Sequence, residues 1–236
     1  MSKVAYITGG TKGIGLGIAK ALVSDGYNVV ITGRSEEGIQ SASNMLNGFR
    51  TDCCLGVVAD VRSIEDQSAA IEAARKKWGD INVVIANAGI GYFASIEELT
   101  PTQWNDVIDI NLTGAFNTLK AALPSLINTK GYYITIASLA GTNFFANGSA
   151  YNASKFGLVG FTQAVMLDLR KKDIKVSTIM PGSVATYFNN HIPDESDAWK
   201  IQSEDIGQIV SDLLKMHPRT LPSKIEVRPS RPPSAR

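Results

Sequence analysis

A glycine-rich turn, Thr8-Gly9-Gly10-Thr11-Lys12-Gly13-Ile14-Gly15, joins a short apolar run to a segment with helical periodicity. The run spans Lys3 to Thr8, and Ile14, Ile18 and Leu22 then repeat every four residues, as on one face of a helix. Glycines allow the backbone to bend sharply here and to approach a pyrophosphate, which a helix N-terminus also attracts. The strand before the turn and the helix after it favour a dinucleotide phosphate site over a purely structural turn.

Apolar runs rich in valine and isoleucine recur along the chain and alternate with segments of helical spacing. The runs are Lys3–Thr8, Asn28–Thr32, Leu55–Ala59, Asn82–Ala86, Tyr132–Ala137, Lys175–Met180 and Ile225–Val227. Most are apolar throughout, as in strands buried on both faces of a parallel sheet. Helix starts are predicted at Ser63, Thr100 and Ser203, and a longer helix from about 150 to 172. Repeated βαβ units predict a doubly wound α/β fold.

This pattern predicts a single domain over residues 1–229, followed by a flexible, Pro-rich basic tail over 230–236. The alternative for the tail is a contact with phosphate or with a partner subunit.

Composition excludes several classes of protein. The 236 residues are 44% hydrophobic and 19% charged, which is enough to build a sizeable core. A net charge of +1 argues against a broad nucleic-acid-binding face. The adjacent Cys53 and Cys54 cannot form a disulfide framework, and the two histidines are scattered, so we expect a reducing compartment and no metal site. We further expect no signal peptide and no membrane span, hence a cytoplasmic protein.

The end of the second predicted strand indicates which dinucleotide binds. NAD enzymes usually place an acid there for the ribose 2′-hydroxyl, but this chain has Gly33-Arg34-Ser35 and no acid from Val29 to Ser35. The planar guanidinium of Arg34 could hold a 2′-phosphate, and Lys12 in the glycine turn could add a second positive charge. Either residue alone could be a solvated surface cation. Together they favour NADP(H).

Tyr151 and Lys155 form a candidate acid–base pair. Their i, i+4 spacing on a predicted helix places both side chains on one face, about 6 Å apart. A nearby ammonium and an oxidised nicotinamide would both favour the phenolate, and lowering the tyrosine pKa by three units corresponds to roughly 4 kcal/mol. Ser138 lies at the carboxyl end of the fifth predicted strand, where ligands of open α/β sheets bind, and its hydroxyl could hold a carbonyl oxygen.

Ordered motifs along the chain resemble those of the short-chain dehydrogenase/reductase family in its form of about 250 residues. They are Thr8-Gly-Gly-Thr-Lys-Gly-Ile-Gly15, Asp60-Val61, Asn87-Ala-Gly89, Asn111, Ser138, Tyr151-x-x-x-Lys155 and Pro181-Gly182. The resemblance covers residues 1 to about 186 well and the remainder loosely. It implies a Rossmann fold with helices on both faces of a seven-stranded parallel sheet in the order 3-2-1-4-5-6-7.

The resemblance also implies roles for these residues. Tyr151 would donate the proton in carbonyl reduction, Ser138 would orient the carbonyl, and Lys155 would lower the Tyr151 pKa and hold the nicotinamide ribose. Asn111 would support a water that relays protons to Lys155, unless it is only a polar residue that kinks its helix. The implied cofactor-binding residues are Gly9, Thr11, Lys12, Gly13, Ile14, Gly15, Arg34, Ser35, Asp60, Val61, Asn87, Ala88, Gly89, Tyr151, Lys155, Pro181, Gly182 and Thr186. Of these, Asp60 and Val61 would flank the adenine, and Thr186 would reach the carboxamide.

The substrate side departs from the family pattern, because only Tyr187 to Gln202 separates Thr186 from the next predicted helix. A lid this short indicates an open site or a mobile flap. The candidate substrate pocket contains Ser138, Ala140, Phe144, Phe145, Tyr187 and Phe188, although each aromatic residue could equally belong to the core or to a subunit contact. His191 is interpreted as a surface residue of the lid.

The sequence thus predicts an NADPH-dependent oxidoreductase that reduces a ketone or aldehyde of small-molecule size. A 3-oxoacyl thioester reductase, a sepiapterin-type reductase and a non-catalytic NADP(H)-sensing protein remain alternatives. The resemblance implies a homodimer or homotetramer, and neither nucleic acid nor membrane is expected as a partner.

Overall fold

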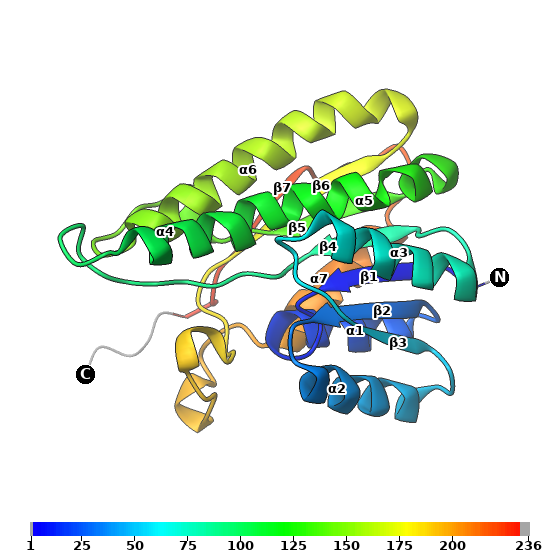
Figure 1. Cartoon of the computed structure of the whole chain (residues 1–236), viewed down its shortest axis with the longest axis horizontal. Coiled ribbons are helices and arrows are strands. Elements are labelled where there is room, and N and C mark those ends of the chain that lie inside the picture. Colours follow the sequence, from blue (N-terminus) through cyan, green and yellow to red (C-terminus); the bar gives the residue numbers. More distant parts are fainter. Residues whose placement is uncertain (1, 232–236) are drawn as a thin grey trace.

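The computed structural model describes residues 2–231 and forms an α/β sandwich around one parallel sheet (Figure 1). The strands are β1 (Val4–Thr8), β2 (Asn28–Gly33), β3 (Cys54–Val58), β4 (Val83–Ala86), β5 (Tyr132–Ile136), β6 (Lys175–Pro181) and β7 (Lys224–Val227). Their order is β3-β2-β1-β4-β5-β6-β7, and the pairs are parallel. This confirms the predicted doubly wound sheet.

Helices cover both faces of the sheet. They are α1 (Gly13–Ser24), α2 (Glu36–Phe49), α3 (Ile64–Trp78), α4 (Pro101–Ile108), α5 (Gly114–Thr129), α6 (Ser149–Leu169) and α7 (Ser203–Lys215). Short helical turns are η1 (Asp109–Thr113), η2 (Leu139–Gly141), η3 (Arg170–Lys172), η4 (Phe188–Asn190) and η5 (Glu195–Asp197). Helices α1, α2 and α7 pack on one face of the sheet, and α3, α5 and α6 on the other (Figure 1).

Side chains on the two faces of each central strand pack into two separate hydrophobic cores, because successive side chains of a strand point in opposite directions. In β1, Ala5 and Ile7 belong to the core under α1, whereas Val4 and Tyr6 belong to the core under α3 and α5. The whole of β1 is therefore buried. This is why the strand sequences are apolar throughout and do not alternate.

Helix α2, which spans residues 36–49, is not predicted from the sequence pattern. Its start is well specified, because Ser35 accepts a hydrogen bond from the Gly38 N–H and Glu36 and Glu37 occupy the first turn. Ile39, Ala42 and Leu46 form its buried face. The many small and polar residues between them obscure this stripe in the sequence.

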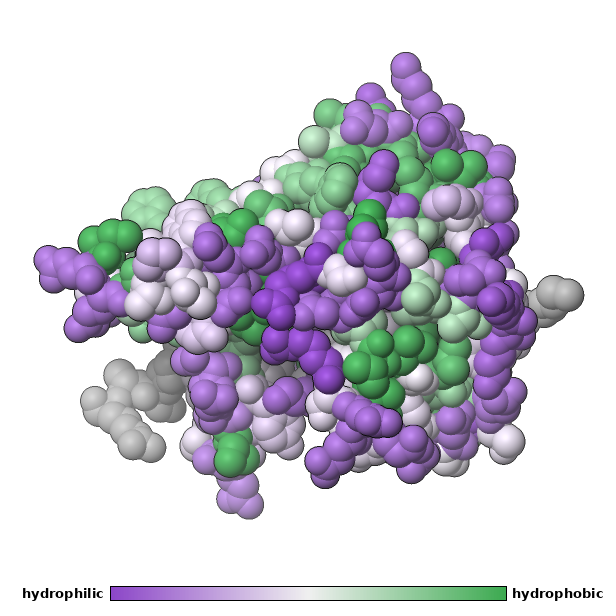
Figure 2. Space-filling view, viewed as in Figure 1, coloured by the Kyte–Doolittle hydropathy of each residue, from purple (hydrophilic) through white to green (hydrophobic). Residues whose placement is uncertain are grey.

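The edge of the sheet at β3 is partly exposed. Figure 2 shows hydrophobic surface over this strand, next to hydrophilic side chains, and Val58 is 52% exposed. Within residues 2–231, no helix is both long enough and apolar enough to cross a bilayer. The predicted tail, residues 230–236, lies mostly outside the described residues.

Candidate active site

The carboxyl ends of the strands open into a cleft of about 900 Å³. Most of the predicted site residues line it, namely Gly9, Thr11, Lys12, Gly13, Ile14, Arg34, Ser35, Asp60, Val61, Asn87, Ala88, Gly89, Ser138, Tyr151, Lys155, Pro181, Gly182, Thr186, Tyr187 and Phe188. They come from loops that follow different strands. Because parallel strands end at one edge of the sheet, the fold brings these distant segments together.

The glycine turn between β1 and α1 has a conformation that requires glycine. Gly9 and Gly13 have φ values of 65° and 54°, in the left-handed region that side chains disfavour. A Cβ atom on Gly15 would lie 2.2 Å from the Gly9 carbonyl oxygen, so no side chain fits there. The turn can therefore present the N-terminus of α1 to a phosphate group without an intervening side chain.

Asn87 fixes this turn to the end of β4. Its side-chain amide donates hydrogen bonds to the Thr8 and Gly9 carbonyl oxygens at 2.9 and 3.1 Å. The Thr8 hydroxyl in turn accepts from the Asn87 and Ala88 N–H groups at 3.0 and 3.1 Å. Asn87 also lines the cleft, and these bonds hold the glycine turn and the loop after β4 in register.

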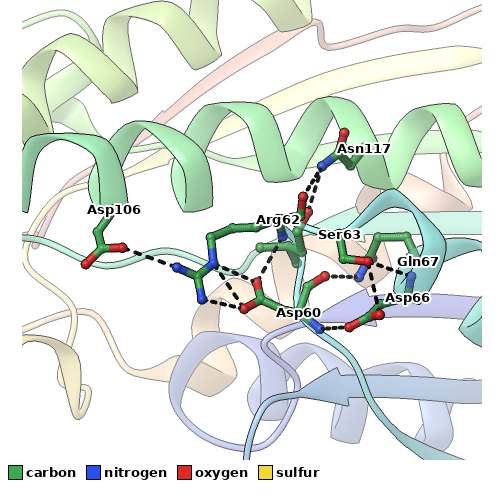
Figure 3. Close-up of polar contacts among 8 residues, drawn as sticks. Asp60, Arg62, Ser63, Asp66, Gln67, Asp106 and Asn117 are labelled. Carbon is green, nitrogen blue, oxygen red and sulfur yellow. Dashed lines mark hydrogen bonds and ion pairs between the residues drawn. The ribbon is translucent and has the colours of Figure 1, made fainter. Parts of the chain in front are cut away.

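Asp60 is tightly bound by protein groups at the end of the cleft next to β3 (Figure 3). The Arg62 guanidinium donates to both carboxylate oxygens, at 2.7 Å to Oδ2 in the shortest contact, and it also reaches Asp106 on α4 at 3.2 Å. Arg62 is the largest cause of the lowered Asp60 pKa, and Arg34 contributes. The predicted contact of Asp60 with adenine would thus have to share a carboxylate that Arg62 already binds.

The loop around Asp60 is held from two sides (Figure 3). The Asp60 N–H donates to Asp66 at 2.9 Å, and Gln67 on α3 donates to the Asp60 carbonyl oxygen at 3.2 Å. On the other side, the Asn117 amide of α5 donates to the carbonyl oxygens of Val61 and Arg62 at 3.0 Å. This wall of the cleft is consequently preorganised before any ligand binds.

Arg34 and Lys12 are exposed side chains of the same cleft. Arg34 directly follows β2, and Lys12 is the residue before α1. The Lys12 ammonium lies 5.7 Å from the ring centroid of Tyr187. Ser35 caps α2 through the 3.1 Å bond that its hydroxyl accepts from the Gly38 N–H. A 2′-phosphate at the end of β2 would therefore meet a guanidinium and a capped helix N-terminus.

Ser138, Tyr151 and Lys155 converge at the opposite end of the cleft. Ser138 follows β5, and its Oγ accepts from the Ala140 N–H at 3.1 Å. Tyr151 and Lys155 lie one turn apart on α6, with the ammonium 5.7 Å from the Tyr151 ring centroid. Lys155 is only 4% exposed and donates to the Ile136 carbonyl oxygen at 3.1 Å. The structure thus brings together three side chains, one from the loop after β5 and two from α6.

The pKa of Tyr151 departs from the sequence-based expectation. Within the protein, burial raises this pKa, and the hydrogen bond with Ser138 acts in the opposite direction. For Lys155, whose charged form is the protonated one, burial has the opposite effect and lowers the pKa from 10.5 to about 8. The expected fall in the Tyr151 pKa also counted a nicotinamide cation, so the protein groups alone do not produce it.

Asn111 lies beneath the cleft in a single π-helical turn, η1, between α4 and α5. Its carboxamide is 1% exposed, accepts from the Ile90 N–H at 2.8 Å and donates to the Ile90 carbonyl oxygen and to Ser154. Such turns are frequent at functional sites because they interrupt the regular hydrogen bonds of a helix. The Asn111 side chain therefore anchors the loop after β4.

The loop after β6 completes the cleft. Pro181 is buried at the end of β6, and Gly182 follows it. Thr186 lies against the glycine turn, because a Cβ atom on Gly13 would be 3.4 Å from its side chain. The Thr186 hydroxyl accepts from the Phe188 N–H at 3.3 Å. This loop thus joins the glycine turn to the segment that begins at Tyr187.

The predicted substrate pocket is only partly assembled. Tyr187 and Phe188 line the cleft, but Ala140, Phe144 and Phe145 do not. Ala140 is a buried residue of η2, and Phe144 is 87% exposed. Phe145 faces another ring, that of Phe93, at 5.9 Å. These three residues lie in η2 or in the segment that follows it, outside the lining of the cleft.

Two groups of residues in or beside the cleft are not predicted from the sequence. At the β3 end of the cleft, Arg62 forms ion pairs with Asp60 and with Asp106. In the sequence, the one sign of the first pair is that Arg62 follows Asp60 by two residues. Gly91 lines the cleft at the Tyr151 end, and Phe93 lies beside it, with its ring centroid 5.5 Å from that of Tyr151. Their position directly after Asn87-Ala-Gly89 was the available signal, since the loop after β4 ends at the cleft.

His191, interpreted as a lid surface residue, also lines the cleft. Its ring nitrogen contacts the buried carboxylate of Asp197, to which Lys200 binds at 2.6 Å. Lys200 and then His191 are the main causes that lower the Asp197 pKa to about 2. His191 therefore takes part in a hydrogen-bonded network within the lid.

Fold and site together define a Rossmann-type oxidoreductase, and comparison with known proteins places the chain within that class. The family model for short chain dehydrogenases matches residues 3–197. The chain belongs to this family.

Individual relatives cover nearly the whole chain. It is 37% identical to trans-4-hydroxycyclohexanecarboxylate dehydrogenase of Sinomonas cyclohexanicum, over 90% of this chain and 84% of the relative. An alcohol dehydrogenase from the archaeon Thermococcus sibiricus, complexed with 5-hydroxy-NADP, superposes with a TM-score of 0.92 at 29% identity, covering 98% and 99% of the two chains. A Brucella melitensis 3-ketoacyl-(acyl-carrier-protein) reductase complexed with NADH gives 0.88 at 25% identity, covering 97% and 98%.

Proposed function

We propose that this protein is an NADPH-dependent reductase that converts a ketone or aldehyde carbonyl into an alcohol. The observation that carries the proposal is the convergence of Ser138, Tyr151 and Lys155 at one end of a cleft that the glycine turn also lines. A bound nicotinamide cofactor supplies the hydride for such a reduction. The protein then has to orient the carbonyl and deliver one proton to its oxygen.

Each of the three side chains has a part in that proton transfer. The Ser138 hydroxyl donates a hydrogen bond to the carbonyl oxygen and fixes its position beside the phenol. Tyr151 gives its proton to the same oxygen as the alcohol forms. Lys155, whose pKa is about 8, provides a positive charge near the phenol that favours loss of this proton. Asn111 keeps the loop after β4 in place through its bonds to Ile90.

NADP(H) is proposed as the cofactor because the end of β2 carries a cation where an NAD enzyme usually has an acid. Arg34 and Lys12 would bind the 2′-phosphate, whose charge is absent from NAD(H). The relatives leave this preference open, since one of the solved structures holds an NADP derivative and the other NADH.

Cofactor titration with the purified protein tests this assignment. Nicotinamide fluorescence should show NADPH binding at least tenfold tighter than NADH, and Arg34→Ala should remove most of that difference. Glu97→Ala, a change at an exposed acid outside the cleft, is the matched control and should leave both affinities unchanged. Equal or tighter NADH binding would contradict the NADP(H) assignment and favour an NAD-linked alcohol dehydrogenase.

Turnover distinguishes the enzyme from an NADP(H)-sensing protein, the second candidate. With NADPH and a panel of ketones, Tyr151→Phe should retain cofactor binding and lose at least about 100-fold in rate. A wild-type protein that binds NADPH but reduces none of the ketones would contradict the enzymatic proposal. We also propose a homodimer or homotetramer in the cytoplasm, which size-exclusion chromatography with light scattering and cell fractionation would test.

A further inference from the structure

Four aromatic rings form a cluster around the proposed proton donor. This aromatic cluster consists of Phe93, Phe145, Tyr151 and Phe188. The Tyr151 ring centroid lies 5.5 Å from those of both Phe93 and Phe188, and the Phe93 and Phe188 centroids are 6.3 Å apart. These separations and the tilted ring planes are those of favourable aromatic contacts. Tyr151 therefore has hydrocarbon rings against it from two loops.

The cluster depends on Gly91. A Cβ atom on this residue would lie 2.8 Å from Cζ of Phe188 and 3.0 Å from Cζ of Phe93. Its φ is outside the left-handed region, so glycine is needed here for space and not for backbone conformation. The absence of a side chain at Gly91 lets the rings of the β4 loop and of the lid close on each other beside Tyr151.

Phe188 belongs to a segment whose base is fixed. Val184 forms a parallel bridge with Ile201, and the Ala185 N–H donates to the Ile201 carbonyl oxygen at 2.9 Å. The segment between these positions also pairs its own charges, because Asp197 binds both His191 and Lys200. The lid thus pairs Lys200 with Asp197 internally and contributes an aromatic ring to the Tyr151 end of the cleft.

We propose that Phe188, held against Tyr151 by Gly91 and Phe93, is the specificity-determining residue, and that the preferred substrates are ketones with an aromatic or alicyclic ring on the carbonyl carbon. This inference rests on the proposed carbonyl reductase function. A ring placed on Phe188 would bury apolar surface and make an aromatic contact, both of which a small aliphatic ketone forgoes. The reaction balances as ketone, NADPH and one proton giving a secondary alcohol and NADP⁺. The hydride forms the new C–H bond, and Tyr151 supplies the proton to oxygen.

Steady-state kinetics with acetophenone, cyclohexyl methyl ketone and 2-butanone test the proposal. With NADPH, kcat/KM should be at least tenfold higher for the two ring ketones than for 2-butanone. Phe188→Ala should lower kcat/KM for the ring ketones at least tenfold relative to kcat/KM for 2-butanone, mainly through KM. Phe49→Ala, which removes an exposed ring on α2, is the control and should change neither.

Gly91→Ala provides an independent variant, since its methyl group would push the two phenylalanine rings away from each other. It should reduce the preference for ring ketones while leaving NADPH affinity within about twofold. A wild-type enzyme that reduces 2-butanone as well as acetophenone, or a Phe188→Ala enzyme with an unchanged preference, would overturn the inference while leaving the reductase function intact.

Binding measurements separate a failure of this inference from a failure of the proposed function. Calorimetry would compare acetophenone and 2-butanone on the NADP⁺-loaded protein, which cannot reduce either ketone. Tighter acetophenone binding that is lost in Phe188→Ala supports the inference even if no ketone is turned over with NADPH. Equal binding of the two ketones would overturn it.

Discussion

At the scale of single residues, Lys155 is a buried cation whose charge lowers the stability of the folded protein. Its ammonium is 4% exposed and has the Ile136 carbonyl oxygen as its hydrogen-bond acceptor. Burial lowers its pKa from 10.5 to about 8 because the charged form is poorly solvated inside the protein. Below pH 8 the folded protein therefore holds a buried charge that the unfolded chain would solvate.

Lys155→Met should remove the free-energy penalty of the buried ammonium and should also abolish the proposed ketone reduction. The unfolded lysine binds more protons than the folded one between pH 8 and 10.5, so the stability of the wild type rises with pH across that window. The full penalty below pH 8 corresponds to roughly 3 kcal/mol. We expect Lys155→Met to be more stable than the wild type at pH 7 by about 1 to 3 kcal/mol, with the difference shrinking toward pH 10.5.

Urea unfolding at pH 7 and pH 10 measures this effect. Lys76→Met, a change at an exposed cation of α3, is the control and should alter neither stability nor ketone reduction noticeably. A Lys155→Met protein that is less stable than the wild type at pH 7 would show that the charge has a stabilising partner.

At the scale of elements, the turn between β1 and α1 has a backbone conformation with no room for a side chain at Gly15. Gly15→Ala would place a methyl carbon 2.2 Å from the Gly9 carbonyl oxygen and 2.6 Å from the Asn87 amide nitrogen. Both neighbours are fixed, the first by the backbone and the second by its hydrogen bonds to Thr8 and Gly9. We expect a loss of about 1 to 3 kcal/mol in stability and at least a tenfold weaker affinity for NADPH.

The matched change is Gly48→Ala in α2, where an added Cβ meets nothing within 4 Å. Because alanine is the better helix former, this variant should gain about 0.5 to 1 kcal/mol and bind NADPH normally. Thermal unfolding and cofactor titration on both variants measure the contrast. Normal NADPH binding by Gly15→Ala would mean that the turn can rearrange without losing the phosphate site.

At the scale of the whole molecule, α7 fastens the C-terminal part of the chain to the first helix. The two helices cross at glycines, since a Cβ on Gly207 would lie 2.6 Å from the Gly17 carbonyl oxygen. Asp25, just after α1, accepts hydrogen bonds from Ser211 and Lys215 at 2.6 and 2.8 Å. This crossing joins segments at opposite ends of the sequence beside the glycine turn (Figure 1).

Gly207→Ala should force α1 and α7 apart and destabilise the protein by about 1 to 3 kcal/mol. Gly160→Ala, in an α6 position with open space around it, is the comparison and should be neutral or slightly stabilising. Guanidinium unfolding of the two variants provides the measurement. Equal stability of Gly207→Ala and the wild type would show that the crossing can widen at no cost.

Local pattern was sufficient for much of the fold. The buried strands are continuous apolar runs, the glycine turn has glycine at each tight position, and the Thr100 capping box starts α4 where the sequence indicated. Helix α2 was missed because its buried stripe of Ile39, Ala42 and Leu46 is interrupted by small and polar residues. The π-helical turn at Asn111 was not predicted, since its extra residue leaves no periodic signal, and a kink at Asn111 was only the alternative to its proposed role in a proton relay.

The sequence by itself determined the α/β class, the glycine turn after β1 and the placement of Tyr151 and Lys155 one turn apart on a helix, because each depends on neighbours within a few residues along the chain. Tertiary structure alone decided that Arg62 binds the Asp60 carboxylate and Asp106 of α4, that Phe144 points into solvent, and that Phe93 and Phe188 meet at Tyr151. These contacts join residues from loops after different strands. Their distances are set by sheet order and loop path, which no local spacing in the sequence records.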